Sequence, residues 1–154
     1  MKARTIVMTL VLCFVGVTVC FADGSMMGRW KLNEAKSKLS PGMSRNTTVV
    51  YAAVGDNVKV TIDGIGSNGK PAHSEWTGNF DGKDYPVTGN PNTDTRAFTK
   101  FSDRTLTFTE KKNGKVTLTG QIVVSADGKR RTVTSSGTDP TGKKISGTAV
   151  YDKQ

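Results

Sequence analysis

Apolar and polar residues alternate along most of the chain beyond residue 27. Val58, Val60 and Ile62 alternate with polar side chains, and residues 115–124 repeat this alternation. A period of two over such stretches predicts strands with one apolar face and one face toward water. We expect about ten strands on this pattern, at 28–32, 46–54, 58–65, 71–80, 84–88, 93–101, 105–111, 115–124, 129–137 and 143–151.

Short turns separate these stretches at regular intervals. Asn-Gly or Asp-Gly pairs followed by lysine recur at 68–70, 81–83, 113–115 and 127–129. Such pairs favour tight hairpin turns, because these turns need a positive φ. Gly114, Gly128 and Gly142 are 14 residues apart, which is the length of one strand plus one turn. The turns therefore predict strands that are joined in sequence by hairpins.

A flat sheet of so many hairpin-linked strands would leave two unpaired edges and one unburied face. Closing the sheet into a barrel removes both problems. We therefore expect an all-β fold, an antiparallel up-and-down β-barrel of about eight to ten strands. A two-sheet sandwich is the alternative, which the regular hairpins disfavour. One short helix should follow the first strand, with Asn33 as its cap, Glu34–Lys36 as its first turn and an end near residues 40–42.

The first 22 residues differ in composition from the rest. A basic head, Met1–Arg4, precedes an apolar run of 16 residues, Ile6–Phe21, and Cys20 and Ala22 place small residues before Asp23. This is the layout of a secretory signal peptide, and the run is shorter than the roughly 20 residues of a spanning helix. We expect residues 1–22 to be a signal peptide and 23–154 a single domain that is secreted or periplasmic.

Cleavage at this site changes the chemistry of the chain. Cys13 and Cys20 leave with the leader, so the mature chain has no thiol, disulfide or cysteine metal site. Loss of Lys2 and Arg4 lowers the formal net charge from +9 to +7. This charge predicts weak attraction to anionic surfaces. Nucleic acid is not expected as a partner, because no basic run is interleaved with aromatic residues and export removes that partner.

The turn charges predict two unequal barrel ends, because alternate turns of an up-and-down barrel lie at the same end. The turns near residues 69, 91, 114 and 142 hold six lysines and three acidic residues. Those near residues 56, 82, 103 and 128 hold four basic and five acidic residues. The first end should therefore face an anionic ligand or surface.

The segment Gly28-Arg29-Trp30-Lys31-Leu32 opens the mature domain. A Gly-x-Trp motif on the first strand, followed by a short helix and a meander, resembles the lipocalin-like (calycin) barrels, which include lipocalins and fatty-acid-binding proteins. The chain looks most like the small secreted bacterial members of this group. The resemblance implies structural roles for Gly28 and Trp30, with Trp30 closing one barrel end beneath a basic side chain, either Lys153 or Arg131.

The chain departs from that pattern in its last strand and its first connection. It ends in a strand at Ala149–Tyr151, where lipocalins commonly carry a helix. Residues 33–44 are too few for the two-helix lid of fatty-acid-binding proteins. Those proteins often hold the ligand carboxylate with an Arg-x-Tyr pair, and Ala149 stands here in the place of the arginine.

No motif in the chain predicts catalysis or metal binding. His73 is the sole histidine, Glu75 lies two residues further on the same strand face, and no Gly-x-Ser-x-Gly elbow occurs. One histidine and one carboxylate are too few ligands for a zinc site. The remaining acids lie mostly in turns, where they bond the backbone. We expect no catalytic residues, no metal, no cofactor and no enzymatic activity.

Large aromatic residues are the candidates to line an interior. Trp76 and Phe98 lie in mid-strand, and we also consider Tyr85 and Phe108 as ligand contacts. Arg96 shares a strand face with Phe98, so an inward Phe98 would bring Arg96 inward, where it could orient an acidic head group. We favour an exterior or rim position for the side chain of Arg96. The alternative for all the aromatics is that they fill the barrel.

These features favour a monomeric, exported barrel that binds a small apolar or amphipathic ligand and has no chemistry of its own. The alternative is a packed barrel that acts as a structural or surface-interaction protein through its basic loops. A cavity of several hundred Å³ would favour the first function and a filled interior the second.

We predict that the exported protein begins at or near Asp23. This prediction rests on the basic head, the apolar run and the small residues Cys20 and Ala22. N-terminal sequencing of the exported protein is the measurement. A retained Met1, or a lipid on Cys20, would contradict it.

Overall fold

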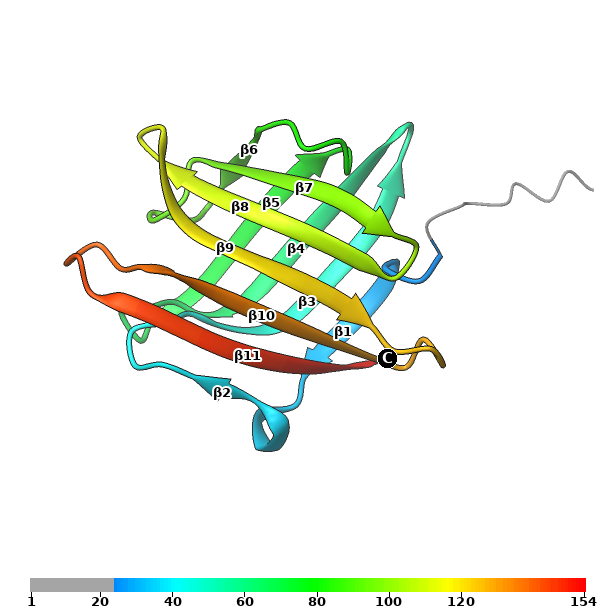
Figure 1. Ribbon diagram of the computed structural model, residues 1–154, viewed down its shortest axis with the longest axis horizontal. Coiled ribbons are helices and arrows are strands. Elements are labelled where there is room, and N and C mark those ends of the chain that lie inside the picture. Colours follow the sequence, from blue (N-terminus) through cyan, green and yellow to red (C-terminus); the bar gives the residue numbers. More distant parts are fainter. Residues whose placement is uncertain (1–23) are drawn as a thin grey trace, which may run out of the picture.

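The strands form one closed antiparallel sheet in a computed structural model that describes residues 24–154 (Figure 1). The predicted signal peptide, 1–22, lies outside the described residues. The strands are β1 (Gly28–Leu32), β2 (Lys38–Leu39), β3 (Arg45–Val54), β4 (Asn57–Ile65), β5 (Pro71–Gly78), β6 (Tyr85–Thr88), β7 (Thr95–Ser102), β8 (Thr105–Lys112), β9 (Lys115–Val124), β10 (Arg130–Thr138) and β11 (Lys144–Lys153).

Pairing of the first strand with the last closes the barrel. On β1, Trp30 faces Val49 of β3 on one side and Lys153 of β11 on the other. Every other neighbour in the ring is the next strand in sequence, from β3 to β11. Among the described residues, ten strands therefore form an up-and-down barrel, and β2 is an additional strand. The predicted barrel is confirmed, and the sandwich is excluded because the sheet has closed on itself.

The segment after β1 differs from the expected helix. It forms a single 3-10 turn, η1 (Glu34–Lys36), and the side chain of Asn33 accepts a hydrogen bond from the Lys36 amide at 3.2 Å. The chain then runs as β2 beside β11, where Leu39 faces Gly147. The helix ends earlier than residues 40–42 because this stretch continues the edge pairing of β11 beyond the end of β1.

The two barrel ends are built from alternate turns, as the meander predicted. One end carries the turns at residues 66–70, 89–94, 113–114 and 139–143, and we call it the open end. The other carries the β3–β4, β7–β8 and β9–β10 turns, and we call it the closed end. The β8–β9 and β10–β11 turns project to the left in Figure 1, and the C-terminus lies on the opposite side. Lys70, Lys115 and Lys143 thus lie at the same end.

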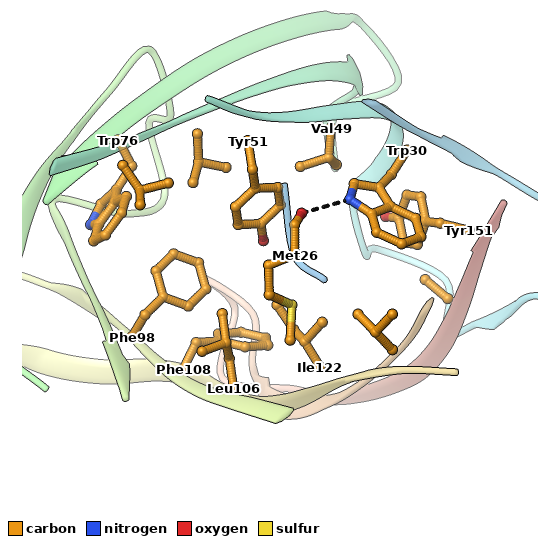
Figure 2. Close-up of a cluster of buried hydrophobic side chains, with 14 of the residues drawn as sticks. Met26, Trp30, Val49, Tyr51, Trp76, Phe98, Leu106, Phe108, Ile122 and Tyr151 are labelled. Atoms are coloured by element: carbon orange, nitrogen blue, oxygen red, sulfur yellow. Dashed lines mark hydrogen bonds between the residues drawn. The ribbon is translucent and has the colours of Figure 1, made fainter. Parts of the chain in front are cut away.

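Large side chains fill the closed half of the barrel. Met26, which precedes β1, is 2% exposed and lies between the opposite walls of the sheet, where the indole N–H of Trp30 donates to its carbonyl at 2.9 Å (Figure 2). The segment before β1 therefore plugs this end. The most deeply buried large side chains here are Trp30, Val60, Trp76, Leu106 and Val124.

Two cations lie over the fully buried Trp30. The guanidinium carbon of Arg131 is 5.4 Å from a Trp30 ring centroid, and Nζ of Lys153 is 5.2 Å away. The sequence left open which cation would take this place, and both do. Gly28 has φ +104°, which favours glycine, and a Cβ on it would lie 3.2 Å from Cε of Lys153.

We predict that Trp30→Ala lowers the free energy of unfolding by about 3–5 kcal/mol, because it leaves a cavity in the closed half. The matched control is Phe101→Ala. Phe101 is 80% exposed, so its truncation should change stability by no more than about 0.5 kcal/mol. Urea unfolding followed by circular dichroism measures both. Equal losses would show that Trp30 is not part of the core.

Candidate functional site

The open half of the barrel contains a cavity of about 680 Å³. It reaches the surface between the turns of the open end, where Ser67, Asn90 and Pro140 line it. The volume falls within the range of small-molecule sites in proteins. Its inner wall is made by Val49, Tyr51, Ile62, Ser74, Phe98, Phe108, Leu118, Ile122, Val133, Ser135, Ala149 and Tyr151.

Residue size explains why one half is hollow and the other is filled. Ser74, Ser135 and Ala149 are buried and line the cavity. In the closed half the buried positions hold Trp76 and Leu106 instead. Small side chains on three inward strand faces leave the open half unfilled. The barrel is therefore packed at one end and hollow at the other.

The structure separates the aromatic candidates into two groups. Phe98 and Phe108 line the cavity, and their ring centroids are 6.2 Å apart. Trp76 does not line it: its ring packs edge-on against Phe98 at 4.9 Å, and its N–H donates to the Arg96 carbonyl at 2.8 Å. Trp76 therefore belongs to the packed layer inside the barrel and holds the ring of Phe98 in place.

Tyr85 also lies outside the cavity lining. Its ring covers Gly78, where a Cβ would come within 2.4 Å of the tyrosine ring, and its hydroxyl donates to Asp81 at 2.9 Å. The ring also packs edge-on against Trp76 at 5.7 Å. Tyr85 thus belongs with Trp76 to the packed layer.

Arg96 is buried, so the exterior or rim position that we favoured is wrong. It is 5% exposed, lines the cavity and donates to Oε1 of Glu110 from Nη2 at 2.5 Å and from Nε at 2.9 Å. Thr93 donates its hydroxyl to the other carboxylate oxygen at 2.9 Å. A buried cation is tolerated here because a carboxylate on the facing strand neutralises it.

Sequence reasoning missed Glu110, although a signal was present. Glu110 has the same strand parity as Phe108, which was a candidate to face inward, and it lies opposite Arg96 in the β7–β8 register. Glu110 was overlooked because acidic residues were expected to lie in turns. Together with Thr93, the pair forms a satisfied polar cluster in the cavity wall.

Arg131 forms the inner end of the cavity with Tyr51 and Tyr151. Its guanidinium carbon is 4.5 Å from the Tyr151 ring centroid and 5.1 Å from that of Tyr51. Burial raises the pKa of the Tyr151 hydroxyl, and the charge of Arg131 works against that rise. The phenol therefore stays protonated at neutral pH. Sequence reasoning considered Arg131 as a cover for Trp30 but not as part of a cavity.

The acidic groups at the rim of the open end are held by nearby donors. Asp94 accepts from Nζ of Lys112 at 2.6 Å and from the Asn113 amide at 2.7 Å, and these contacts lower its pKa. The hydroxyl of Thr141 and the Lys143 amide likewise lower the pKa of Asp139. Both carboxylates are therefore ionised at neutral pH, and Asp94 stabilises the neighbouring β8–β9 turn while Asp139 stabilises its own turn.

His73 lies on the outer surface of β5, with 58% of its side chain exposed. Its Nδ1 is 2.6 Å from Asp63, and that hydrogen bond raises its pKa above 6.5. Within residues 24–154, no group of three His, Cys, Asp or Glu side chains could hold a metal ion. The same part of the chain has no helix long and apolar enough to cross a membrane.

We predict that Glu110→Ala lowers the free energy of unfolding by about 3–5 kcal/mol, because it leaves the buried Arg96 without a counter-charge. The double variant Arg96→Met/Glu110→Leu should recover much of this loss, since it removes both charges. Urea unfolding at pH 7 is the measurement.

The matched control is Lys59→Ala. Lys59 pairs with Glu75 at 2.7 Å, but both side chains are 38% exposed, so the loss should be below about 1 kcal/mol. A Glu110→Ala variant that is no less stable than Lys59→Ala would show that the Arg96–Glu110 pair is not buried in solution.

Comparison with known proteins adds little to this description. No protein family model matches the chain, and no curated protein matches it. Among solved structures it is similar to a redesigned β-barrel, mFAP1, bound to DFHBI, with 17% identity and a TM-score of 0.45. That match covers 86% of this chain and 98% of the other. The resemblance to calycin barrels therefore stays an expectation from the sequence.

Proposed function

We propose that this protein is an exported, monomeric barrel that binds one small amphipathic molecule in the cavity and performs no chemistry on it. The observation that carries the proposal is the cavity of about 680 Å³ at the open end of a barrel whose other end is packed. A concave, largely apolar site with a few polar groups is the usual form of a small-molecule site.

The wall chemistry indicates an apolar ligand body. Phe98, Phe108 and Ile122 present rings and methyl groups along one side of the cavity, and contact with them removes apolar ligand surface from water. The polar Arg96–Glu110 pair is internally neutral, so it can orient a ligand without demanding a charge on it. This combination suits a molecule with a long apolar part and a polar group.

The predicted export and the charge of the predicted mature chain support the same proposal. The basic leader favours a protein that works outside the cytoplasm. The +7 charge of the predicted mature chain favours a place near anionic surfaces. The lysine-rich turns lie at the open end, where the cavity reaches the surface. An anionic ligand would meet this end first.

We predict saturable, one-to-one binding of a fluorescent fatty-acid analogue, and displacement of that probe by unlabelled amphiphiles. Ser135→Phe should weaken probe binding by about tenfold or more, equivalent to about 1.4 kcal/mol, because the new ring occupies the cavity. Ser136→Phe is the matched control, since Ser136 is the next residue on β10 and is exposed. Its affinity should stay within about twofold of the parent.

Two results would contradict the proposal. Absence of saturable binding across fatty acids, retinoids and small aromatics would favour the packed, surface-interacting barrel. Equal weakening by Ser135→Phe and Ser136→Phe would place the probe outside the cavity. Circular dichroism of each variant checks that the fold is retained.

A further inference from the structure

Few polar side chains are buried in the barrel. In the part of the chain that the structure describes, six residues with polar or charged side chains are buried. Three of them, Thr93, Arg96 and Glu110, form one hydrogen-bonded cluster. A fourth, Arg131, lies against three aromatic rings that stabilise its charge. Two buried serines remain, and neither belongs to these groups.

These serines are Ser74 on β5 and Ser135 on β10, and both line the cavity. They are 8% and 9% exposed. Ser74 has the strand parity of Trp76, and Ser135 that of Arg131, so both side chains point into the barrel. Among the described residues, neither hydroxyl has a hydrogen-bond partner. A hydroxyl carries one donor and two acceptor sites, so each serine offers the cavity an unused hydrogen-bonding group.

The two hydroxyls lie on opposite walls of the barrel. In the ten-strand ring, β5 and β10 are five steps apart in either direction. Phe98 on β7 and Phe108 on β8 line the wall between them on one side, and Val49 on β3 lines it on the other. Aromatic and aliphatic side chains therefore separate the two serines.

A ligand that enters the cavity takes water away from both serines. A buried hydroxyl without a partner costs free energy, and a ligand group that does not replace the hydrogen bonds of displaced water loses affinity. An apolar molecule, or a chain with one polar head, leaves at least one of the two hydroxyls unpaired. A molecule with a polar group on each of two opposite sides pairs both.

We propose that the ligand carries a hydroxyl or carbonyl group on each of two opposite sides of its apolar body, one for Ser74 and one for Ser135. This inference rests on the proposed function above and specifies the ligand of that cavity. The rings of Phe98 and Phe108 contact the apolar body between the two groups. A ligand hydroxyl suits either serine, because each serine hydroxyl both donates and accepts.

The test compares ligands that share one skeleton and differ in their number of hydroxyl groups. Biphenyl, biphenyl-4-ol and biphenyl-4,4′-diol form one series, and naphthalene, naphthalene-2-ol and naphthalene-2,6-diol form a shorter one. Each compound competes with the fluorescent fatty-acid analogue for the parent protein. In at least one series the diol should bind about fivefold more tightly than the mono-ol, because it makes one more buried hydrogen bond.

The order of affinity within a series separates this proposal from simple apolar burial. Each hydroxyl makes the compound more polar, so a cavity that recognised only apolar surface would bind the unsubstituted hydrocarbon most tightly and the diol least. A diol that binds no more tightly than its mono-ol in both series would overturn the inference. This ranking needs the parent protein alone, so it does not depend on the folding of any variant.

Two conservative variants assign the contacts. Ser74→Ala and Ser135→Ala each remove one hydroxyl and should reduce the advantage of the diol over the mono-ol to within about twofold. The affinity for the hydrocarbon should not change. Ser136→Ala is the matched control, since Ser136 follows Ser135 on β10 and is exposed. Retention of the advantage in either cavity variant, or its loss in Ser136→Ala, would overturn the assignment to the two serines.

The outcomes distinguish this inference from the proposed function. Absence of saturable binding of the fluorescent analogue and of every compound in both series would remove the proposed function and the inference together. Displacement of the analogue by both series without a preference for the diol would leave a binding cavity and remove only the ligand with two polar sides.

Discussion

Pairing of β1 with β11 closes the sheet and creates the interior of the barrel. Three residue pairs, from Trp30–Lys153 to Leu32–Tyr151, join the first strand to the last. Without them the meander would have two open edges and no interior. With them, each strand has an inner and an outer face, and the parity of a residue decides which of the two faces its side chain joins. The same pairing brings Trp30 beneath the cations of the last two strands, which seals one end.

A closed barrel must then be filled or left hollow, and this chain does both. Tryptophan, leucine and the inserted Met26 fill the closed half. Serine and alanine on inward faces leave the open half empty. The packed layer provides stability for a chain whose predicted mature form contains no disulfide. The hollow layer can therefore hold small residues at positions where a core would need large ones.

The two inward arginines show how the facing strand decides the surroundings of identical side chains. Arg96 meets Glu110 across the β7–β8 register, so its charge and two of its nitrogens are satisfied within the protein. Arg131 meets aromatic rings instead, and two of its nitrogens have no protein partner among the described residues. Arg96 and Glu110 form a neutral pair in the cavity wall, whereas the charge of Arg131 is stabilised by the rings of Tyr51 and Tyr151. The chemistry of the candidate site therefore follows from which strand faces which.

Most of the strands, the turns and the all-β class could be predicted from the amino-acid sequence, because alternation and Asx-Gly turns are local signals. The resemblance of its Gly-x-Trp motif to calycin barrels also implied that Trp30 would lie beneath a cation. Only the tertiary structure decided the register, and with it the burial of Arg96 against Glu110 and the extra strand β2. It alone separated Phe98 and Phe108, which line the cavity, from Trp76 and Tyr85, which do not. Parity assigns a residue to a face of a strand, but its height along the barrel axis depends on strand stagger, which only closure sets.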